Sequence, residues 1–147
     1  MTATIQFCTF TVHGLWFGVP VDRVQEIVRH LSLTRVPLAP PVVRGLMNLR
    51  GQIVTAVDLR RRLEFPDRNA DERPMNVVIR AEDGLVSLLV DQIGDVVVVE
   101  ADTRDAPPPT LKGAARELIR GAYQFPNRLL LELDLDRALD VAQAGRL

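Results

Sequence analysis

The chain has 147 residues, 47% of them hydrophobic and 25% charged, which is enough to build one compact domain around a buried core. Its formal net charge is −1, and this excludes a strong overall attraction to nucleic acid or to an anionic membrane. The single cysteine, Cys8, excludes an intrachain disulfide and a cysteine-rich metal site.

The N-terminal residues show neither a basic start nor a long apolar run, so we expect no signal peptide. No segment of the sequence approaches the ~20 apolar residues that are needed to span a bilayer. We therefore expect a cytoplasmic protein that does not insert directly into a membrane.

Short apolar and β-branched runs predict a domain built mainly from strands. Two turn signals, at residues 13–14 and 82–84, predict hairpins because each ends in a glycine that can adopt a positive φ. Residues 21–30 are expected to form a helical turn or an irregular strand. The predicted strands, in chain order, cover residues 5–12, 15–21, 52–57, 76–81, 85–90, 95–100 and 128–133.

Helices are predicted to be few and short. Asp58 is expected to cap a helix that follows it directly, and Asp134 or Asp136 to cap another near the end of the chain. The charged segment 66–74 and the proline-rich segment 101–113 are predicted to be loops, because proline removes a backbone donor and favours polyproline II.

The sequence also matches itself. Residues 43–63 align with residues 119–139 at a constant offset of 76, with six identities in 21 positions. A weaker match aligns 21–28 with 90–97 in the same order. We infer a duplicated unit of roughly 70 residues, and therefore two small β subdomains that gain stability by sharing one core.

Comparison of the two repeats distinguishes residues that build the fold from residues that are candidates for function. Features present in both halves, such as an Arg-Gly pair before a strand and an Asp-Leu pair after it, are expected to build the fold. Between them, residues 48–51 (Asn-Leu-Arg-Gly) correspond to residues 124–127 (Gln-Phe-Pro-Asn). We expect the turn to be retained, because Asn127 tolerates left-handed geometry nearly as glycine does. Arg50 has no counterpart, so it is a candidate for function.

The histidines, the cysteine and the acidic residues of the sequence do not form a known catalytic or metal-binding motif. His13 is interpreted as a turn residue, His30 as a surface residue and Cys8 as a packed, inert thiol. Pairs of acidic residues are interpreted as caps or solvated faces, and the sequence holds no phosphate-loop, dinucleotide-binding or nucleophile-elbow motif. We therefore expect no catalytic residues, no metal site and no cofactor.

The stretch "NLRGQIVTAVDLRRRL", residues 48–63, resembles the signature of the CheW family, the adaptor proteins of bacterial chemosensory arrays. The stretches "FTVHGLWFGVPVDRVQEI", "VSLLVDQIGDVV" and "LIRGAYQFPNRLLLELDLDRAL" are also similar in order and spacing. The resemblance therefore covers roughly residues 5–143, nearly the whole chain.

This resemblance implies a mainly β fold: two intertwined SH3-like barrels of five strands each, from an internal duplication, with a few short helices. Residues 1–147 are then a single CheW-like domain. The first repeat is expected over roughly 14–75 and the second over 76–143, with an N-terminal strand at 4–12 packing across the two.

The resemblance also implies a function without catalysis. Members of the family bind the tip of a chemoreceptor's cytoplasmic hairpin and the regulatory domain of the histidine kinase CheA, and so join receptor to kinase at membrane-associated arrays. Asn48, Arg50 and Glu26 match family positions important for this coupling, with Val24 as an apolar contact beside them. The five donors of an arginine suit carboxylates or carbonyls on a helical hairpin.

Two alternatives stay open. One is a CheW-like adaptor of a non-flagellar pathway, such as surface motility or biofilm signalling. The other, more remote, is a β-barrel that binds single-stranded nucleic acid through Arg50 and Arg60–Arg62. No stacking platform of aromatic residues accompanies these arginines, so we expect a solvated helix face and no nucleic-acid partner. Thr55 stands where the family often has proline, and Pro107–Pro109 receive no role.

Overall fold

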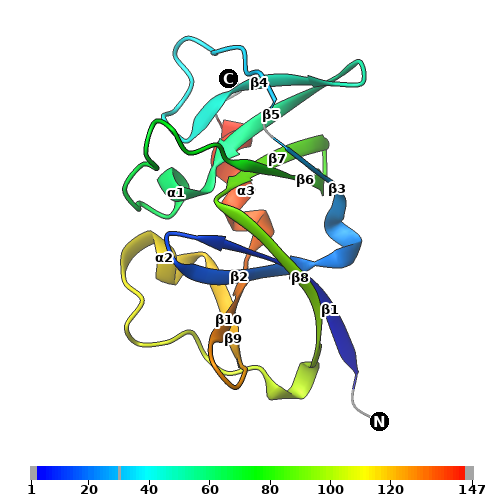
Figure 1. Ribbon diagram of the computed structural model, residues 1–147, viewed down its shortest axis with the longest axis vertical. Helices are drawn as coiled ribbons and strands as arrows, with labels where there is room; N and C mark the ends of the chain where they lie inside the picture. Colours follow the sequence, from blue (N-terminus) through cyan, green and yellow to red (C-terminus); the bar gives the residue numbers. More distant parts are fainter. Residues whose placement is uncertain (1–2, 30, 145–147) are drawn as a thin grey trace.

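Two five-stranded sheets dominate the structure, a computed structural model that describes residues 3–29 and 31–144 (Figure 1). His30 therefore lies outside the described residues. The strands are β1 (Thr4–Val12), β2 (Leu15–Pro20), β3 (Val24–Val28), β4 (Val43–Leu49), β5 (Gln52–Asp58), β6 (Met75–Ala81), β7 (Gly84–Val90), β8 (Gln92–Glu100), β9 (Ile119–Gln124) and β10 (Leu129–Leu133). The helices are α1 (Leu59–Arg62), α2 (Gly113–Glu117) and α3 (Leu135–Ala144), with 3-10 turns η1 (Val21–Arg23) and η2 (Ala101–Thr103).

Both sheets have the same internal order. One runs β8-β1-β2-β10-β9 and the other β3-β6-β7-β5-β4, so that β6 to β10 occupy the places that β1 to β5 occupy in turn. The hairpin β1–β2 joins strands of the second half, and the hairpin β6–β7 joins strands of the first. Figure 1 shows the resulting sheets one above the other along the long axis. The predicted mainly β fold of two intertwined five-stranded units is confirmed.

The N-terminal strand β1 lies between strands from the two halves. It pairs antiparallel with β2, where Phe10 lies opposite Phe17, and antiparallel with β8 on its other edge. The repeat boundaries at 14–75 and 76–143 stay a prediction. Strand pairing shows which strands associate, but it does not show at which residue one repeat ends and the next begins.

The strands β4 and β9 are not predicted by the sequence pattern. Both end the strand order of their sheet, and both mix polar residues with a glycine, Gly45 or Gly121. A Cβ on Gly45 would lie 2.5 Å from the carbonyl oxygen of Thr34, which pairs with Leu46. This glycine lets the preceding loop cover the edge of β4, a contact that no local pattern reports.

The predicted helix caps are confirmed at two positions. The Asp58 carboxylate accepts the backbone N–H of Arg60 at 3.0 Å at the start of α1. At α3 it is Asp134 that accepts the N–H of Arg137, at 3.2 Å. The helix α2 was not predicted. Its Ala115 is buried in the largest apolar cluster, and packing of this kind, more than propensity, stabilises short helices.

Three apolar clusters hold the molecule together. The largest, called here the shared core, lies between the sheets and buries Phe10, Val57 and Leu88 completely. Each sheet also has a smaller cluster of its own, around Phe7 in one and Met47 in the other. Burying one large apolar side chain contributes about 1.5–3 kcal/mol. Because the shared core holds more buried residues than either smaller cluster, we expect each sheet to depend on it for stability.

A buried ionic network lies where the chain passes from β7 to β8. Asp91, in this passage, accepts hydrogen bonds from Arg60 Nη2 at 2.7 Å and from Arg68 Nη2 at 3.1 Å. It also accepts the backbone N–H of His13, in the β1–β2 turn, at 2.8 Å. The side chains of Asp91, Arg60 and Arg68 are 14%, 12% and 8% exposed. The network therefore fastens the β1–β2 hairpin of one sheet to the segments that follow β5 and β7 of the other.

The arginines at positions 60–62 do not form a solvated helix face, so that prediction is wrong. Arg60 belongs to the Asp91 network, Arg61 binds Asp67, and Arg62 donates to the carbonyl of Arg137 in α3 at 2.8 Å. Their donors are used within the chain, which counts against an open basic patch for nucleic acid.

The Asp91 network predicts a loss of stability in acid. Burial acts to raise the pKa of Asp91, but hydrogen bonds from Arg60, His13 N–H and Arg68 outweigh it and hold this pKa below its ordinary value. Such a group stabilises the fold fully above its unfolded pKa of ~3.9, and this stabilisation is lost as the pH falls through the folded pKa.

We therefore expect the free energy of unfolding, measured in urea, to fall as the pH drops below about 4. Asp91→Asn removes the titrating carboxylate, so the difference between wild type and variant should shrink in acid. A difference that stays constant from about pH 7 to about pH 3 would exclude Asp91 as the source.

Candidate functional site

Arg50 lies in a two-residue turn between β4 and β5. Leu49 pairs with Gln52, so Arg50 and Gly51 form the loop, with φ angles of +51° and +86°. Two successive positive φ angles are typical of a type I′ turn, whose twist matches that of a hairpin. The side-chain oxygen of Asn48 accepts the Gly51 N–H at 2.7 Å. Asn48 therefore fastens the turn that presents Arg50.

Arginine is an unusual residue for this conformation, since a left-handed backbone costs a residue with a side chain about 1–2 kcal/mol. The second half builds its turn differently. Pro126 fixes a negative φ and Asn127 has no positive φ, so the expectation that the left-handed turn is retained is wrong. The length is kept, because the Phe125 N–H donates to the Arg128 carbonyl at 3.0 Å.

Arg50 Nη2 forms an ion pair with Glu26 Oε1. Glu26 lies on β3 and Arg50 follows β4, and these two strands stand at opposite ends of the strand order of their sheet. The side chain of Arg50 is 69% exposed and that of Glu26 is 25% exposed, so most of the guanidinium stays open to solvent. The structure thus brings together three of the predicted site residues, Arg50, Glu26 and Asn48.

Val24, the fourth predicted site residue, does not join this group as an exposed contact. It begins β3 opposite Ile79 of β6 and packs, half-buried, against the shared core. Its side chain therefore contributes to packing between the sheets. A role for Val24 in binding stays a prediction.

Two exposed isoleucines lie on the strands that carry the predicted site residues. Ile53 is 63% exposed and lies opposite Asn48 across the hairpin, while Ile27 is 42% exposed and follows Glu26 on β3. Exposed apolar side chains beside charged ones are typical of protein contact surfaces. Sequence reasoning missed both, because isoleucine is an ordinary residue of a buried strand and no local signal marks these two as exposed.

The strained turn predicts the effect of Arg50→Asn on stability. Asparagine adopts positive φ readily and is favoured at the first loop position of a type I′ turn, while an exposed ion pair contributes only ~0–1 kcal/mol. We expect the free energy of unfolding in urea to be unchanged or up to ~1 kcal/mol higher. A loss of more than about 1 kcal/mol would show that the pair with Glu26 holds the fold.

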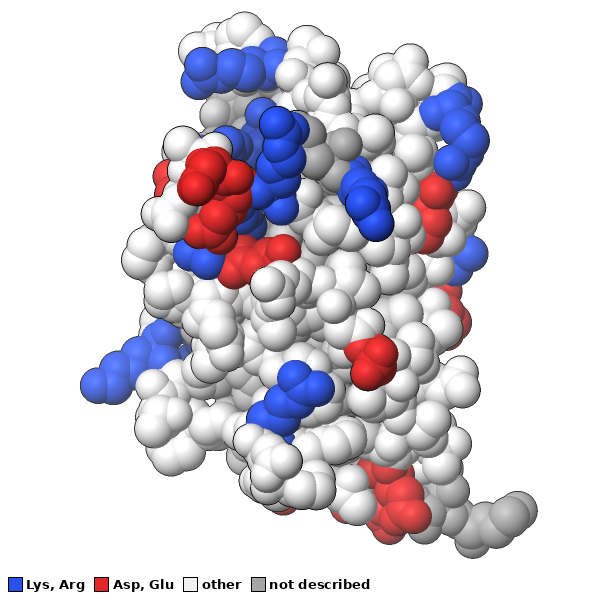
Figure 2. Space-filling view, in the orientation of Figure 1, with Lys and Arg blue, Asp and Glu red and all other residues white. Residues whose placement is uncertain are grey.

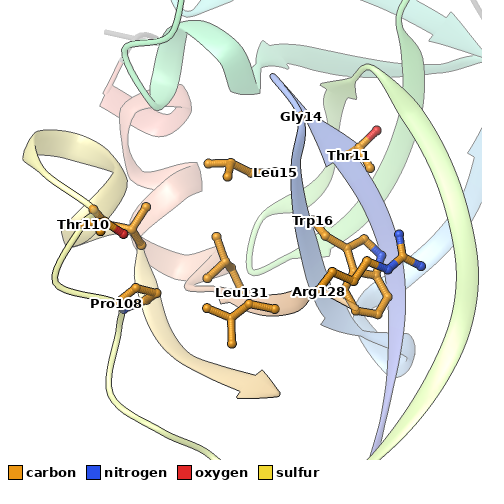
Figure 3. Close-up of a pocket in the computed structure, with 10 residues that line it drawn as sticks. Thr11, Gly14, Leu15, Trp16, Pro108, Thr110, Arg128 and Leu131 are labelled. Atoms are coloured by element: carbon orange, nitrogen blue, oxygen red, sulfur yellow. The ribbon is translucent and has the colours of Figure 1, made fainter. Parts of the chain in front are cut away.

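A second surface feature is a hollow of about 330 Å³ beside the β1–β2 hairpin (Figure 3). The Arg128 guanidinium stacks on Trp16 here, 3.6 Å from the ring centre. Pro108, from the proline-rich segment, is one of the residues that line this hollow. The lining residues are Thr11, Gly14, Leu15, Trp16, Pro108, Thr110, Leu111, Arg128, Leu129 and Leu131. This lining fits an apolar group and carries no acid–base pair.

Other chemically interesting side chains have packing contacts. Cys8 is half-buried, and burial raises the pKa of its thiol. The His13 ring packs 4.9 Å from the Phe65 ring. Over residues 3–29 and 31–144, no three His, Cys, Asp or Glu side chains lie together as metal ligands would. In the same part of the chain, no helix has the length and apolar character to cross a membrane.

Comparison with known proteins gives one consistent family. Residues 6–143 match the CheW-like domain. The chain is 30% identical over 144 residues to the chemotaxis protein CheW of Bacillus subtilis, covering 95% of this chain and 92% of that one. It is 25% identical over 114 residues to the protein PilI of Pseudomonas aeruginosa, covering 78% and 64%. The scaffolding protein TtCheW from Thermoanaerobacter tengcongensis superposes with a TM-score of 0.82 at 21% identity, covering 95% and 94%.

Proposed function

The chain belongs to the CheW-like domain family, a family of chemotaxis adaptors and scaffolds, and we propose that it joins chemoreceptors to the histidine kinase CheA in a bacterial chemosensory pathway. On this proposal it binds the tip of the receptor's cytoplasmic hairpin and the regulatory domain of the kinase. It works in the cytoplasm at membrane-associated receptor arrays, and it needs neither a catalytic step of its own nor a cofactor.

The Arg50 turn is the observation that supports this proposal most directly. Its arginine is exposed, occupies a backbone conformation that disfavours it, and has no counterpart in the second half of the chain. Backbone strain that the fold does not require is typical of functional positions. A planar guanidinium with several donors fits the carboxylates and carbonyls that a helical hairpin presents.

Glu26 prepares Arg50 for such a contact. The ion pair restricts the rotamers of a long side chain, so less conformational entropy is lost when a partner binds. Glu26 engages Nη2 while the side chain of Arg50 stays 69% exposed, so guanidinium donors remain available to a partner. Ile53, opposite Asn48 across the hairpin, adds exposed apolar area beside the turn, and Val24 is proposed as a further apolar contact at the edge of this surface.

A non-flagellar pathway is the second candidate. The similarity to PilI, a protein whose name is not that of a chemotaxis protein, favours an adaptor of the same fold in a pathway such as surface motility or biofilm signalling. Nucleic-acid binding is the weakest alternative, because Arg60, Arg61 and Arg62 already bind groups within the chain.

Co-sedimentation tests the adaptor function. Purified protein is mixed with receptor-containing membranes and purified CheA, and the kinase in the pellet and its autophosphorylation are measured. We expect the kinase to sediment and be activated when all three components are present, and not when the protein is omitted. Equal sedimentation without the protein would contradict the proposal. Receptors and kinases of flagellar and non-flagellar gene clusters, used in parallel, separate the two candidates.

A further inference from the structure

The segment before β4 forms a surface at the start of that strand, whereas the Arg50 turn follows its end. At ~3.3 Å per residue, the two ends of β4 lie roughly 20 Å apart. Leu38, Arg35, Arg44 and Arg61 are among the residues that line an open hollow of about 940 Å³ here. We name these four residues the Leu38 surface. Figure 2 shows several Lys and Arg side chains at the end of the molecule where Figure 1 places this segment.

Leu38 combines a strained backbone with complete exposure of its side chain. Its φ is +70°, and its side chain is fully open to solvent. Glycine or asparagine would adopt this conformation more easily. A leucine here gains no burial within the chain. The side chain of Leu38 therefore contributes nothing to the fold that would offset the strain of its backbone.

The second half of the chain provides an internal comparison. The segment between β3 and β4 takes the same place in its sheet as the segment between β8 and β9 takes in the other. In the later segment, Leu111, Ala115 and Leu118 all pack against the shared core. In the earlier one, Leu31 and Leu33 pack against the cluster around Met47, whereas Leu38 is left to solvent. An exposed leucine is therefore not a requirement of this connection.

Three arginines line the hollow beside Leu38, and two of them have carboxylate partners within the chain. Arg44 is 40% exposed and binds the buried Asp58, and Arg61 is 32% exposed and binds Asp67. Arg35 is exposed, and within the described part of the chain no carboxylate lies at ion-pair distance from it. An exposed leucine near Arg35, which has no carboxylate partner among the described residues, and the part-exposed Arg44 is complementary to an acidic segment that carries an apolar side chain.

We propose that the Leu38 surface binds an acidic segment of a partner protein, with carboxylates at Arg35 and Arg44 and an apolar side chain over Leu38. The inference rests on the proposed adaptor function, because an adaptor holds two partners on two separate faces. The Arg50 turn supplies one face, and the Leu38 surface supplies the other. The contact weakens as salt rises, since its charged part is screened while its apolar part is not.

Two substitutions test the proposal. Leu38→Gly removes the side chain and relieves the positive φ, so its midpoint of thermal unfolding should equal or exceed that of wild type. Arg35→Glu reverses the exposed charge. Glu64→Gly is the matched control, because Glu64 is exposed with a φ of +61° and lies outside the surface. Binding is measured by co-sedimentation with receptor-containing membranes and, separately, by affinity for purified CheA.

We expect Leu38→Gly and Arg35→Glu each to weaken the affinity for one of the two partners by about tenfold or more, and the affected partner to be the same for both variants. Glu64→Gly is expected to leave both affinities unchanged. If wild type binds both partners and the two variants bind equally well, the inference is overturned while the proposed function stands. If wild type binds neither partner, the proposed function and the inference both fall. Weakened binding with Leu38→Gly alone overturns the acidic character of the partner segment.

Discussion

Replacing Arg50 with glutamate is expected to abolish kinase assembly and activation while the protein stays folded. The substitution removes the donors that face solvent and places a second carboxylate beside Glu26. Losing one member of a mostly desolvated charged contact typically weakens binding by ~2–5 kcal/mol, which is about thirtyfold or more in affinity. The measurement is the amount of CheA that sediments with receptor-containing membranes, together with its autophosphorylation rate.

A charge swap distinguishes a contact with a partner from a contact within the chain. Glu26→Arg combined with Arg50→Glu restores an ion pair of the opposite sense between β3 and the turn, but it leaves the wrong charge for the partner. We expect the double variant to be as stable as wild type and as inactive as Arg50→Glu. Recovery of kinase assembly in the double variant would show that Arg50 acts through Glu26 alone.

Replacing Asp91 with alanine is expected to cause the largest loss of stability of any substitution considered. It leaves the buried guanidinium groups of Arg60 and Arg68 without their shared carboxylate, and the His13 N–H without its acceptor. Removing one partner from a buried charged group destabilises proteins by about 3–5 kcal/mol. The check is urea unfolding near neutral pH, with the free energy of unfolding compared between wild type and variant.

The matched control is Asp67→Ala. Asp67 also binds an arginine, Arg61, at 3.0 Å, but its side chain is 55% exposed. Exposed ion pairs contribute little, so we expect a change of ~1 kcal/mol or less. If the alanine variants at positions 91 and 67 lost similar amounts, burial of the network would not be the cause of its effect.

The fold follows from the sequence where local pattern and long-range pairing agree. The hairpin at His13 and Gly14 was predicted correctly, because its turn signal lies between two apolar runs. The edge strands β4 and β9 were not, because each mixes polar residues with a glycine whose role is a close approach by a distant loop. The arginines at 60–62 were misjudged for the same reason, since their acceptors lie up to 76 residues away in the chain.

The candidate site, too, was predictable from the sequence only in part. Comparison of the two halves singles out Arg50, and its exposure agrees with a contact role. The pairing of Arg50 with Glu26 joins residues 24 positions apart on opposite edges of a sheet, which sequence spacing does not reveal. The exposure of Ile53 and Leu38 was not predictable either, because both residues are ordinary members of apolar patterns whose burial depends on what packs over them.

The sequence by itself determined the class of the fold, the duplication, the helix caps and the arginine that the second half lacks, because these depend on local periodicity, turn chemistry and internal comparison. Only the tertiary structure decided which hairpins the two halves exchange, that Arg50 sits in a left-handed turn beside Glu26, and that Asp91 fastens the sheets together. The physical reason is that burial and ion pairing are set by segments distant in the chain, whose approach depends on packing of the whole core.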